Sequence, residues 1–194
     1  MKFIKAFRER FSRRGFFTTT DVKMFLAEKN AGKGYYKLLL HNLSKKGEIT
    51  RAMKGSYTFR KEEAGISSAI TPSYHGLQEA LTIHGIWGQA TNQLLITPRK
   101  VRSGERQALG RKVIVRRISR KMFFGDKAVN YAGEWLNVSD IEKTLIDFRH
   151  FNEPLDRKTL KKLIAKTDNE KIIAYLKMAP KTTRERVLKT LREN

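Results

Sequence analysis

The sequence of 194 residues contains no cysteine, and acidic side chains are scarce beside basic ones. Without cysteine, disulfide scaffolds, thiolate zinc sites and cysteine nucleophiles are excluded. No apolar run approaches the roughly 20 residues that a membrane-spanning helix needs. Residues 1–10 also lack the unbroken apolar stretch of a signal peptide. We therefore expect a cytoplasmic protein without a membrane partner.

Positive charge is the strongest feature of the composition. There are 41 Lys and Arg residues against 19 Asp and Glu, which gives a formal charge of +22. Residues 1–62 carry 16 basic and 5 acidic side chains, and residues 98–121 carry 10 basic side chains and only Glu105 as an acid. A protein this basic attracts polyanions, and nucleic acid is the commonest polyanion in a cytoplasm. The charge therefore favours a nucleic-acid partner.

The pattern of the first sixty residues predicts three helices followed by a hairpin. Apolar residues recur at helical spacing within residues 4–11, 22–26 and 35–45. Two segments typical of strands, residues 48–52 and 57–60, follow around a turn that contains glycine. This order of elements is that of a winged helix-turn-helix.

In a winged helix-turn-helix, expected here over residues 1–62, the third helix fits the major groove of DNA and the hairpin forms the wing. With Tyr36, Leu40 and Leu43 on the buried face of that helix, basic and polar side chains are left to face outward. The candidate DNA-binding residues are Lys33, Tyr35, Lys37, His41, Arg51 and Lys54. Two alternatives remain open, since winged helices also dock proteins and Tyr35 could instead cover the turn before its helix.

The remainder of the chain, residues 68–194, is expected to form a mixed α/β domain that ends in a helical tail. A short helix is expected after Ser73, strands near residues 93–97 and 112–118, and several amphipathic helices from Ser139 onward. The fold class expected for the whole chain is therefore α+β.

Several short motifs in this second part follow one another in the order found in a known family. The residues that carry the motifs are Gly76, Leu77, Ala80, Leu81, His84, Gly85 and Ile86, then Ile96 and Thr97, then Phe123, Phe124 and Gly125, and finally Val138, Ser139, Glu142, Lys143, Leu145 and Asp147. In this order, and behind a winged helix, they resemble the AbiEi antitoxin family of type IV toxin–antitoxin systems over roughly residues 1–150.

The resemblance implies that the winged helix binds double-stranded operator DNA in the operon's own promoter and represses transcription. It also implies that the second domain counters a nucleotidyltransferase-like toxin, by acting on the toxin or on its RNA target, without a stable complex being required. The chain departs from the family in its basic segment 98–121 and in its terminal helices. A stand-alone DNA- or RNA-binding protein without a toxin partner is therefore the alternative.

The basic segment 98–121 predicts a second nucleic-acid surface. If this part of the chain is a strand, Lys112 and Arg116 share one of its faces. The candidate residues of this surface are Arg99, Lys100, Arg102, Arg106, Arg111, Lys112 and Arg116. An RNA, an acidic partner and a hairpin that is merely solvated are the alternatives.

The sequence Glu142–Asp147 invites an interpretation as a nuclease site, because metal-dependent nucleases gather carboxylates and a lysine around Mg²⁺. A separation of five residues on a helix places Glu142 and Asp147 about 140° apart, so they cannot easily share one ion. We instead expect Ser139 and Glu142 to form a helix-capping box and Lys143 to face solvent. No histidine spacing or glycine-rich loop indicates a metal or phosphate site. We therefore expect no enzyme, no catalytic residue, no metal and no cofactor.

Overall fold

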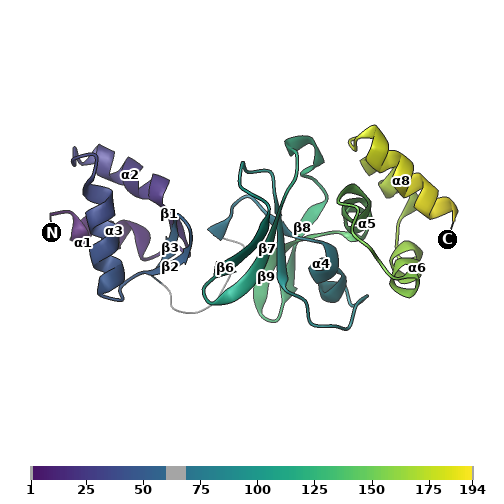
Figure 1. Cartoon of the computed structure of the whole chain (residues 1–194), viewed down its shortest axis with the longest axis horizontal. Helices are drawn as coiled ribbons and strands as arrows, with labels where there is room; N and C mark the ends of the chain where they lie inside the picture. The colour runs from purple at the N-terminus through teal and green to yellow at the C-terminus, as the bar shows by residue number, and fades with distance from the viewer. Residues whose placement is uncertain (1, 60–68, 194) are drawn as a thin grey trace. The chain divides into compact units, whose positions relative to one another are not determined.

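The computed structural model describes residues 2–59 and 69–193 (Figure 1). The fold is α+β, as predicted, with helices and two separate β-sheets. No helix within these two ranges is both long and apolar enough to cross a membrane.

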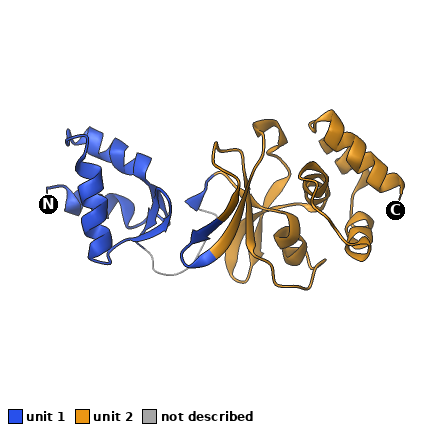
Figure 2. Cartoon of the chain, viewed as in Figure 1, with its two compact units in different colours: residues 1–71, 106–111 blue, residues 72–105, 112–194 orange. Residues whose placement is uncertain are grey.

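The chain divides into two compact units, which have different colours in Figure 2. Unit 1 comprises Met1–Thr71 and Arg106–Arg111, and unit 2 comprises Pro72–Glu105 and Lys112–Asn194. The domain boundary expected between residues 62 and 68 lies outside the described residues.

Unit 1 has the elements of a winged helix-turn-helix in the order that its sequence predicts. Its strands form one antiparallel sheet in the order β1-β3-β2, so the wing hairpin β2-β3 is extended by a strand that precedes the second helix. The sequence did not indicate β1, because a strand of two residues carries no periodicity. The elements are α1 (Ile4–Phe11), β1 (Phe17–Thr18), α2 (Thr19–Glu28), α3 (Tyr35–Lys45), β2 (Thr50–Met53) and β3 (Ser56–Thr58).

An aromatic core holds α3 in place within unit 1. Leu39, Leu40 and Leu43 of α3 pack in the same buried cluster as four phenylalanines from α1, β1 and α2. Those phenylalanines are Phe7, Phe11, Phe17 and Phe25. Their ring centroids lie 4.7 to 5.9 Å apart, the spacing at which aromatic pairs attract each other. The position of α3 is therefore fixed by well-packed rings and leucines rather than by a flexible loop.

A mixed six-stranded sheet of order β6-β7-β5-β4-β9-β8 is the framework of unit 2, although its residues 106–108 in β6 and Arg111 in β7 group with unit 1. Strand β4 pairs antiparallel with β5 and parallel with β9, while β5 pairs parallel with β7 and β8 pairs antiparallel with β9. The strands are β4 (Tyr74–His75), β5 (Gln93–Thr97), β6 (Gly104–Ala108), β7 (Arg111–Arg117), β8 (Asp126–Tyr131) and β9 (Glu134–Ser139).

Helix α5 is the central helix of unit 2, since it contacts α4, α6, α7 and α8. Figure 1 shows α6 and α8 beside α5 at the C-terminal end of the chain. Most of α5 is buried, including the charged Lys143 and Asp147. The helices are α4 (Leu77–Ile83), α5 (Ile141–His150), α6 (Arg157–Ala165), α7 (Asn169–Leu176) and α8 (Lys181–Arg192), with a 3₁₀ turn, η2, at Arg120–Met122.

Candidate nucleic-acid interface

Helix α3 presents a polar, basic face on the side opposite its buried leucines, Leu39, Leu40 and Leu43. Lys37 and His41 are exposed on this face, and Lys33 is exposed in the turn before the helix. Lys45 follows His41 at a spacing of four residues and is also exposed, so Lys37, His41 and Lys45 form a row along the helix.

Tyr35 does not face outward with these residues. Its ring lies edge-on against Phe3 of the N-terminal segment, with centroids 5.9 Å apart. Its hydroxyl oxygen is buried and has no hydrogen-bond partner among the described residues. The reason is helical geometry, because Tyr35 is one turn before the buried Leu39 and therefore shares its face. The expectation of an outward Tyr35 is corrected accordingly.

The wing places two cations in solvent. Arg51 is exposed on β2, and Lys54 is exposed in the turn between β2 and β3. Gly55 closes this turn with a φ of +79°, a conformation that residues with a side chain rarely adopt.

Acidic side chains pair with two arginines of α1 but with no cation of α3 or the wing among the described residues. The carboxylate of Glu48 accepts two hydrogen bonds from Arg8, at 2.9 and 2.8 Å, and Glu28 pairs with Arg10. Residues 29–59 contain seven Lys and Arg residues and only one acid, the engaged Glu48. The following cations of this stretch form no ion pair with any described residue: Lys33, Lys37, Arg51 and Lys54. Positive charge is therefore left uncompensated along α3 and the wing.

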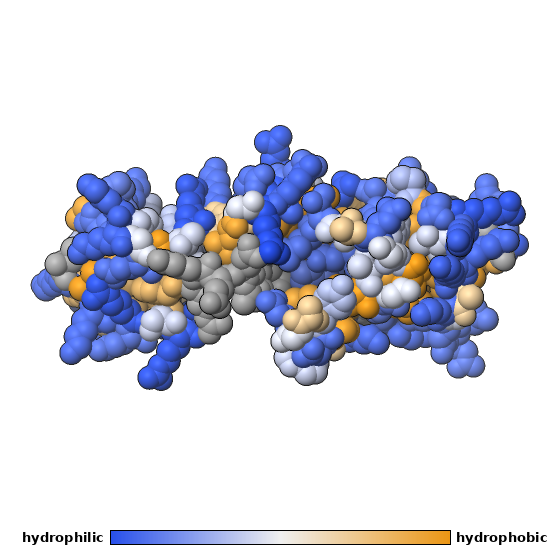
Figure 3. All heavy atoms as spheres, turned by 90° about the horizontal axis from the view of Figure 1, so that it is seen from below, coloured by the Kyte–Doolittle hydropathy of each residue, from blue (hydrophilic) through white to orange (hydrophobic). Residues whose placement is uncertain are grey.

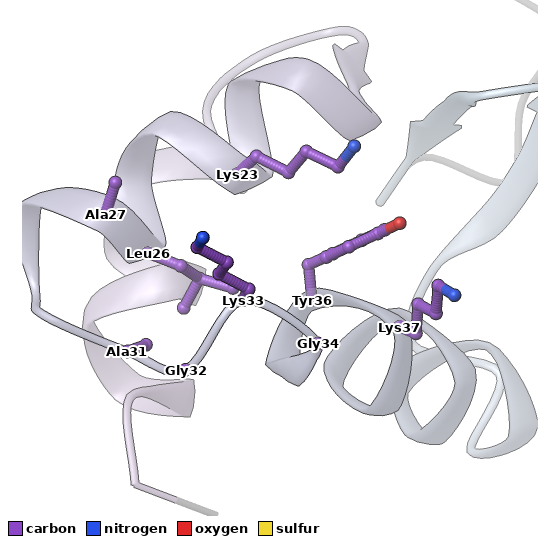
Figure 4. A pocket seen from close by; sticks show the side chains of 9 residues that line it. All are labelled: Lys23, Leu26, Ala27, Ala31, Gly32, Lys33, Gly34, Tyr36 and Lys37. Carbon is purple, nitrogen blue, oxygen red and sulfur yellow. The ribbon is translucent and has the colours of Figure 1, made fainter.

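A pocket of about 560 Å³ lies between the C-terminal half of α2 and the start of α3. Three lysines line it: Lys23 from α2, Lys33 from the turn and Lys37 from α3. Figure 4 shows Lys33 rising from the turn between the two helices and Lys23 extending toward the ring of Tyr36. The ammonium group of Lys23 lies 4.7 Å from the centroid of that ring, close enough for a cation–π interaction. The pocket thus combines three ammonium groups with the N-terminal turn of a helix, an arrangement that favours anions.

Six of the seven candidates for a second surface interact with neighbouring groups, unlike the cations of α3 and the wing. Lys112 lies 2.7 Å from the carboxylate of Glu105, and Arg116 pairs with Glu153. Four of the others, Arg99, Arg102, Arg106 and Arg111, also interact with neighbouring groups. Lys100 is exposed. The set is divided between the two units, since Arg106–Arg111 groups with unit 1.

A buried polar network surrounds the start of α5 in unit 2. Lys143 and Asp147 are both inaccessible to solvent and form an ion pair one helical turn apart. The hydroxyl of Tyr74 donates to Asp147 at 2.9 Å, and the Lys143 ammonium lies 5.0 Å from the ring centroid of Phe124. The expectation that Lys143 faces solvent is therefore wrong. Burial raises the pKa of Asp147, while the charge of Lys143 opposes that rise.

The N-cap of α5 is Asp140 and not Ser139. The Asp140 carboxylate accepts a hydrogen bond from the backbone N–H of Lys143 at 2.8 Å. Glu142 does not complete a capping box, because it accepts from the backbone N–H of Asp168 at 2.9 Å and pairs with Lys171 at 2.8 Å. The hydroxyl of Ser139 instead contacts Thr144 at 2.8 Å. Glu142 and Asp147 thus interact with different protein groups.

Contacts connect motif groups that are far apart in the sequence. A Cβ atom added to Gly76 would collide with the side chain of Ile96, and one added to Gly125 would lie 2.9 Å from Lys143. The Nε2 atom of His84 lies 2.7 Å from the carbonyl oxygen of Ser139. Members of all four motif groups therefore contact another group within unit 2.

Comparison with known proteins identifies a protein of similar fold. No family model matches the chain, and no curated protein does. The fold is similar to that in the crystal structure of the RV2827C protein from Mycobacterium tuberculosis. The TM-score is 0.56 and the sequence identity is 14%. The similarity covers 96% of this chain and 74% of the other.

Sequence reasoning missed two exposed side chains that lie beside the basic face. Lys23 lines the pocket from α2, and Leu38 is 51% exposed on α3. A signal for Leu38 was present in the run Leu38-Leu39-Leu40, because three successive helical residues span about 200° and cannot all face one core.

Figure 3 shows that hydrophilic residues cover most of the visible face of the molecule, with hydrophobic ones only in scattered patches.

Proposed function

We propose that this protein binds double-stranded DNA through unit 1 and represses transcription, and that it is a binding protein rather than an enzyme. The observation that carries the proposal is the uncompensated charge of α3 and the wing, where Lys33, Lys37, Arg51 and Lys54 lack carboxylate partners among the described residues. On α1, by contrast, Arg8 is neutralised. This distribution of charge supports the proposal, because the face formed by α3 and the wing stays positive.

The proposed mechanism divides the interface into anchoring and reading. Lys23 and Lys33, at the pocket before α3, contact backbone phosphates, and the N-terminal turn of α3 adds its partial positive charge. Lys37 and His41 enter the major groove on the exposed face of α3, where lysine can donate to the O6 and N7 atoms of guanine. Arg51 and Lys54 on the wing contact the neighbouring backbone.

The salt dependence of binding to duplex DNA tests this proposal. The logarithm of the binding constant should fall linearly with the logarithm of salt concentration, with a slope of about −0.9 for each neutralised phosphate. In the variant Lys33→Ala/Lys37→Ala, we expect weaker binding and a slope that is shallower by about one unit for each phosphate that the variant leaves without a cation. The control is Lys161→Ala/Lys162→Ala, which removes two exposed lysines of α6. Equal losses of affinity in both variants would mean that only net charge matters and would contradict a defined interface.

Autoregulation follows as part of the same proposal. The AbiEi-like motif order implies an operator in the protein's own promoter, bound in the cytoplasm. Footprinting on the upstream region of the gene tests this directly. A protected site that the Lys33→Ala/Lys37→Ala variant leaves unprotected would support autoregulation, and binding without any preference for this region would contradict it.

For unit 2 we propose the role of an AbiEi-like antitoxin domain. The contacts between Gly76 and Ile96, His84 and Ser139, and Gly125 and Lys143 support this, because they make a single region of motifs that are weak when taken one by one. The test is co-expression with a neighbouring gene for a nucleotidyltransferase-like toxin. We expect the Lys33→Ala/Lys37→Ala variant to rescue growth as the parent does. If neither the parent nor the variant rescued growth, only the DNA-binding role would remain.

The cations at residues 98–121 are proposed as a secondary nucleic-acid contact. Lys100 is the test position, since it is exposed and no described residue pairs with it. We expect Lys100→Ala to make the salt slope shallower by about one unit if the residue contacts a phosphate. If structured RNA competes with duplex DNA at equal affinity and the competition depends on Lys100, this surface serves RNA instead.

A further inference from the structure

The exposed leucine of α3 has an unusual environment for an apolar side chain. Leu38 is 51% exposed, while Leu39 and Leu40, the next two residues of the chain, are 0% and 5% exposed. Leu38 shares the outward side of α3 with His41 and Lys45, at spacings of three and seven residues. It is also the fourth residue of the helix, within the N-terminal part that reaches base edges when a recognition helix enters the major groove.

A single exposed leucine is common on protein surfaces, so the neighbours of Leu38 carry the argument. Lys33 and Lys37 precede it, Arg51 and Lys54 lie on the wing, and none of these four forms an ion pair with a described residue. No acidic residue occurs between Glu28 and Glu48. This apolar side chain therefore lies on a helix whose preceding lysines, Lys33 and Lys37, are uncompensated. A partner with an apolar group between negative charges fits such a surface. The major groove of DNA is such a partner, because the methyl group of a thymine lies there between two phosphate backbones.

We propose that Leu38 contacts the C5-methyl group of a thymine in the major groove and thereby selects an A·T pair at one position of the binding site. This inference rests on the proposed binding of DNA by unit 1. Lys33 and Lys37 hold the helix on the backbone or on guanine edges, whereas Leu38 excludes water from the methyl group. Cytosine has a donor and no methyl group at this edge, so a C·G pair leaves the leucine facing a polar group.

The test removes the methyl group from the DNA and the side chain from the protein in turn. A duplex is selected from a random library by the full-length protein, and each thymine of the selected site is replaced singly by deoxyuridine, which lacks only the C5-methyl. For the unaltered protein, we expect one replacement to weaken binding about fourfold, the value of one methyl-sized group removed from water. Leu38→Ala should bind the original duplex more weakly and be insensitive to that same replacement.

The control variant is Met24→Ala, because Met24 is 62% exposed on α2 and is the other large exposed hydrophobic residue among the described residues of unit 1. Met24→Ala should keep the fourfold sensitivity. If the protein selects no duplex, the proposed function itself fails. If it selects one but no uracil replacement weakens binding, or if Leu38→Ala remains as sensitive as the parent, the inference on Leu38 is overturned while DNA binding stands. A change in oligomeric state caused by Leu38→Ala would also overturn it, since Leu38 would then belong to an interface between copies.

Discussion

The ammonium group of Lys143 and the carboxylate of Asp147 form an ion pair on successive turns of α5, and neither side chain is accessible to solvent. Burying two charges is costly unless each is fully partnered. Asp147 has a second partner in the hydroxyl of Tyr74, at 2.9 Å, and the Lys143 ammonium lies near the rings of Tyr74 and Phe124. The pair thus connects α5 to β4 and to the segment after η2.

Removing only one charge of this pair should destabilise the protein strongly. We expect Lys143→Met to lower the free energy of unfolding by about 3–5 kcal/mol, because Asp147 loses its cation and must either stay charged in a buried site or bind a proton there. The variant Lys143→Met/Asp147→Leu should recover most of this loss, since no charge remains buried. Urea unfolding measures both. If Lys143→Met were as stable as the parent, the site would have to be accessible to water.

Gly125 should tolerate alanine less well than Gly85 does. Both residues have a positive φ, +71° and +67°, which costs alanine about 1–2 kcal/mol. At Gly125 the new Cβ would also lie 2.9 Å from the Cβ of Lys143 and 2.9 Å from the ring of Tyr175, whereas nothing lies within 4 Å at Gly85. Thermal unfolding of Gly125→Ala and Gly85→Ala should therefore differ, with the greater loss at Gly125. Equal losses would mean that only the backbone conformation matters.

The protein should lose stability when the pH falls below about 6.5. Burial lowers the pKa of His150, and the positive charges of Lys143 and Arg186 lower it further, although Asp147 acts in the opposite direction. The unfolded state therefore binds a proton first as the pH falls, which favours unfolding. The stability that His150 contributes is fully present above its pKa in the unfolded state. It is lost as the pH falls toward its pKa in the folded state.

His150→Gln keeps a polar partner within reach of Thr183, whose hydroxyl lies 3.0 Å from the Nδ1 atom of His150. Denaturant midpoints measured between pH 5 and pH 8 should show a smaller drop for this variant than for the parent. A drop of the same size in both proteins would assign the pH dependence to other groups.

The capping box of α2 should contribute about 1 kcal/mol to the stability of unit 1. The Asp21 carboxylate accepts the backbone N–H of Thr18 at 2.7 Å, and the Thr18 hydroxyl accepts the backbone N–H of Asp21 at 3.2 Å. Asp21→Ala removes the carboxylate that accepts both the backbone N–H and the hydroxyl of Thr18. Thr20→Ala, at an exposed position on the same turn, is the control and should change stability by less than half as much. Hydrogen exchange of the α2 amides would locate the loss in this helix.

The sequence alone is sufficient for features that depend on neighbours in the chain. The spacing of Phe7 and Phe11, the cap before Asp21 and the apolar face of residues 35–45 predict the helices of unit 1, because each of these signals acts within one or two helical turns. The excess of basic residues is likewise a property of composition, so it indicates a polyanionic partner whatever the fold.

Partners distant in the sequence are decided only by the tertiary structure. Lys143 is expected in solvent because a lysine at the start of an amphipathic helix is usually exposed, yet β4 and the Phe124 segment cover it and supply its neighbours. Tyr35 is expected to face outward, yet Phe3 meets its ring. The pairing of Glu48 with Arg8, 40 residues apart, leaves the charge of α3 uncompensated. Periodicity gives the face on which a residue lies, but which groups face it depends on packing between segments that only the folded chain brings together.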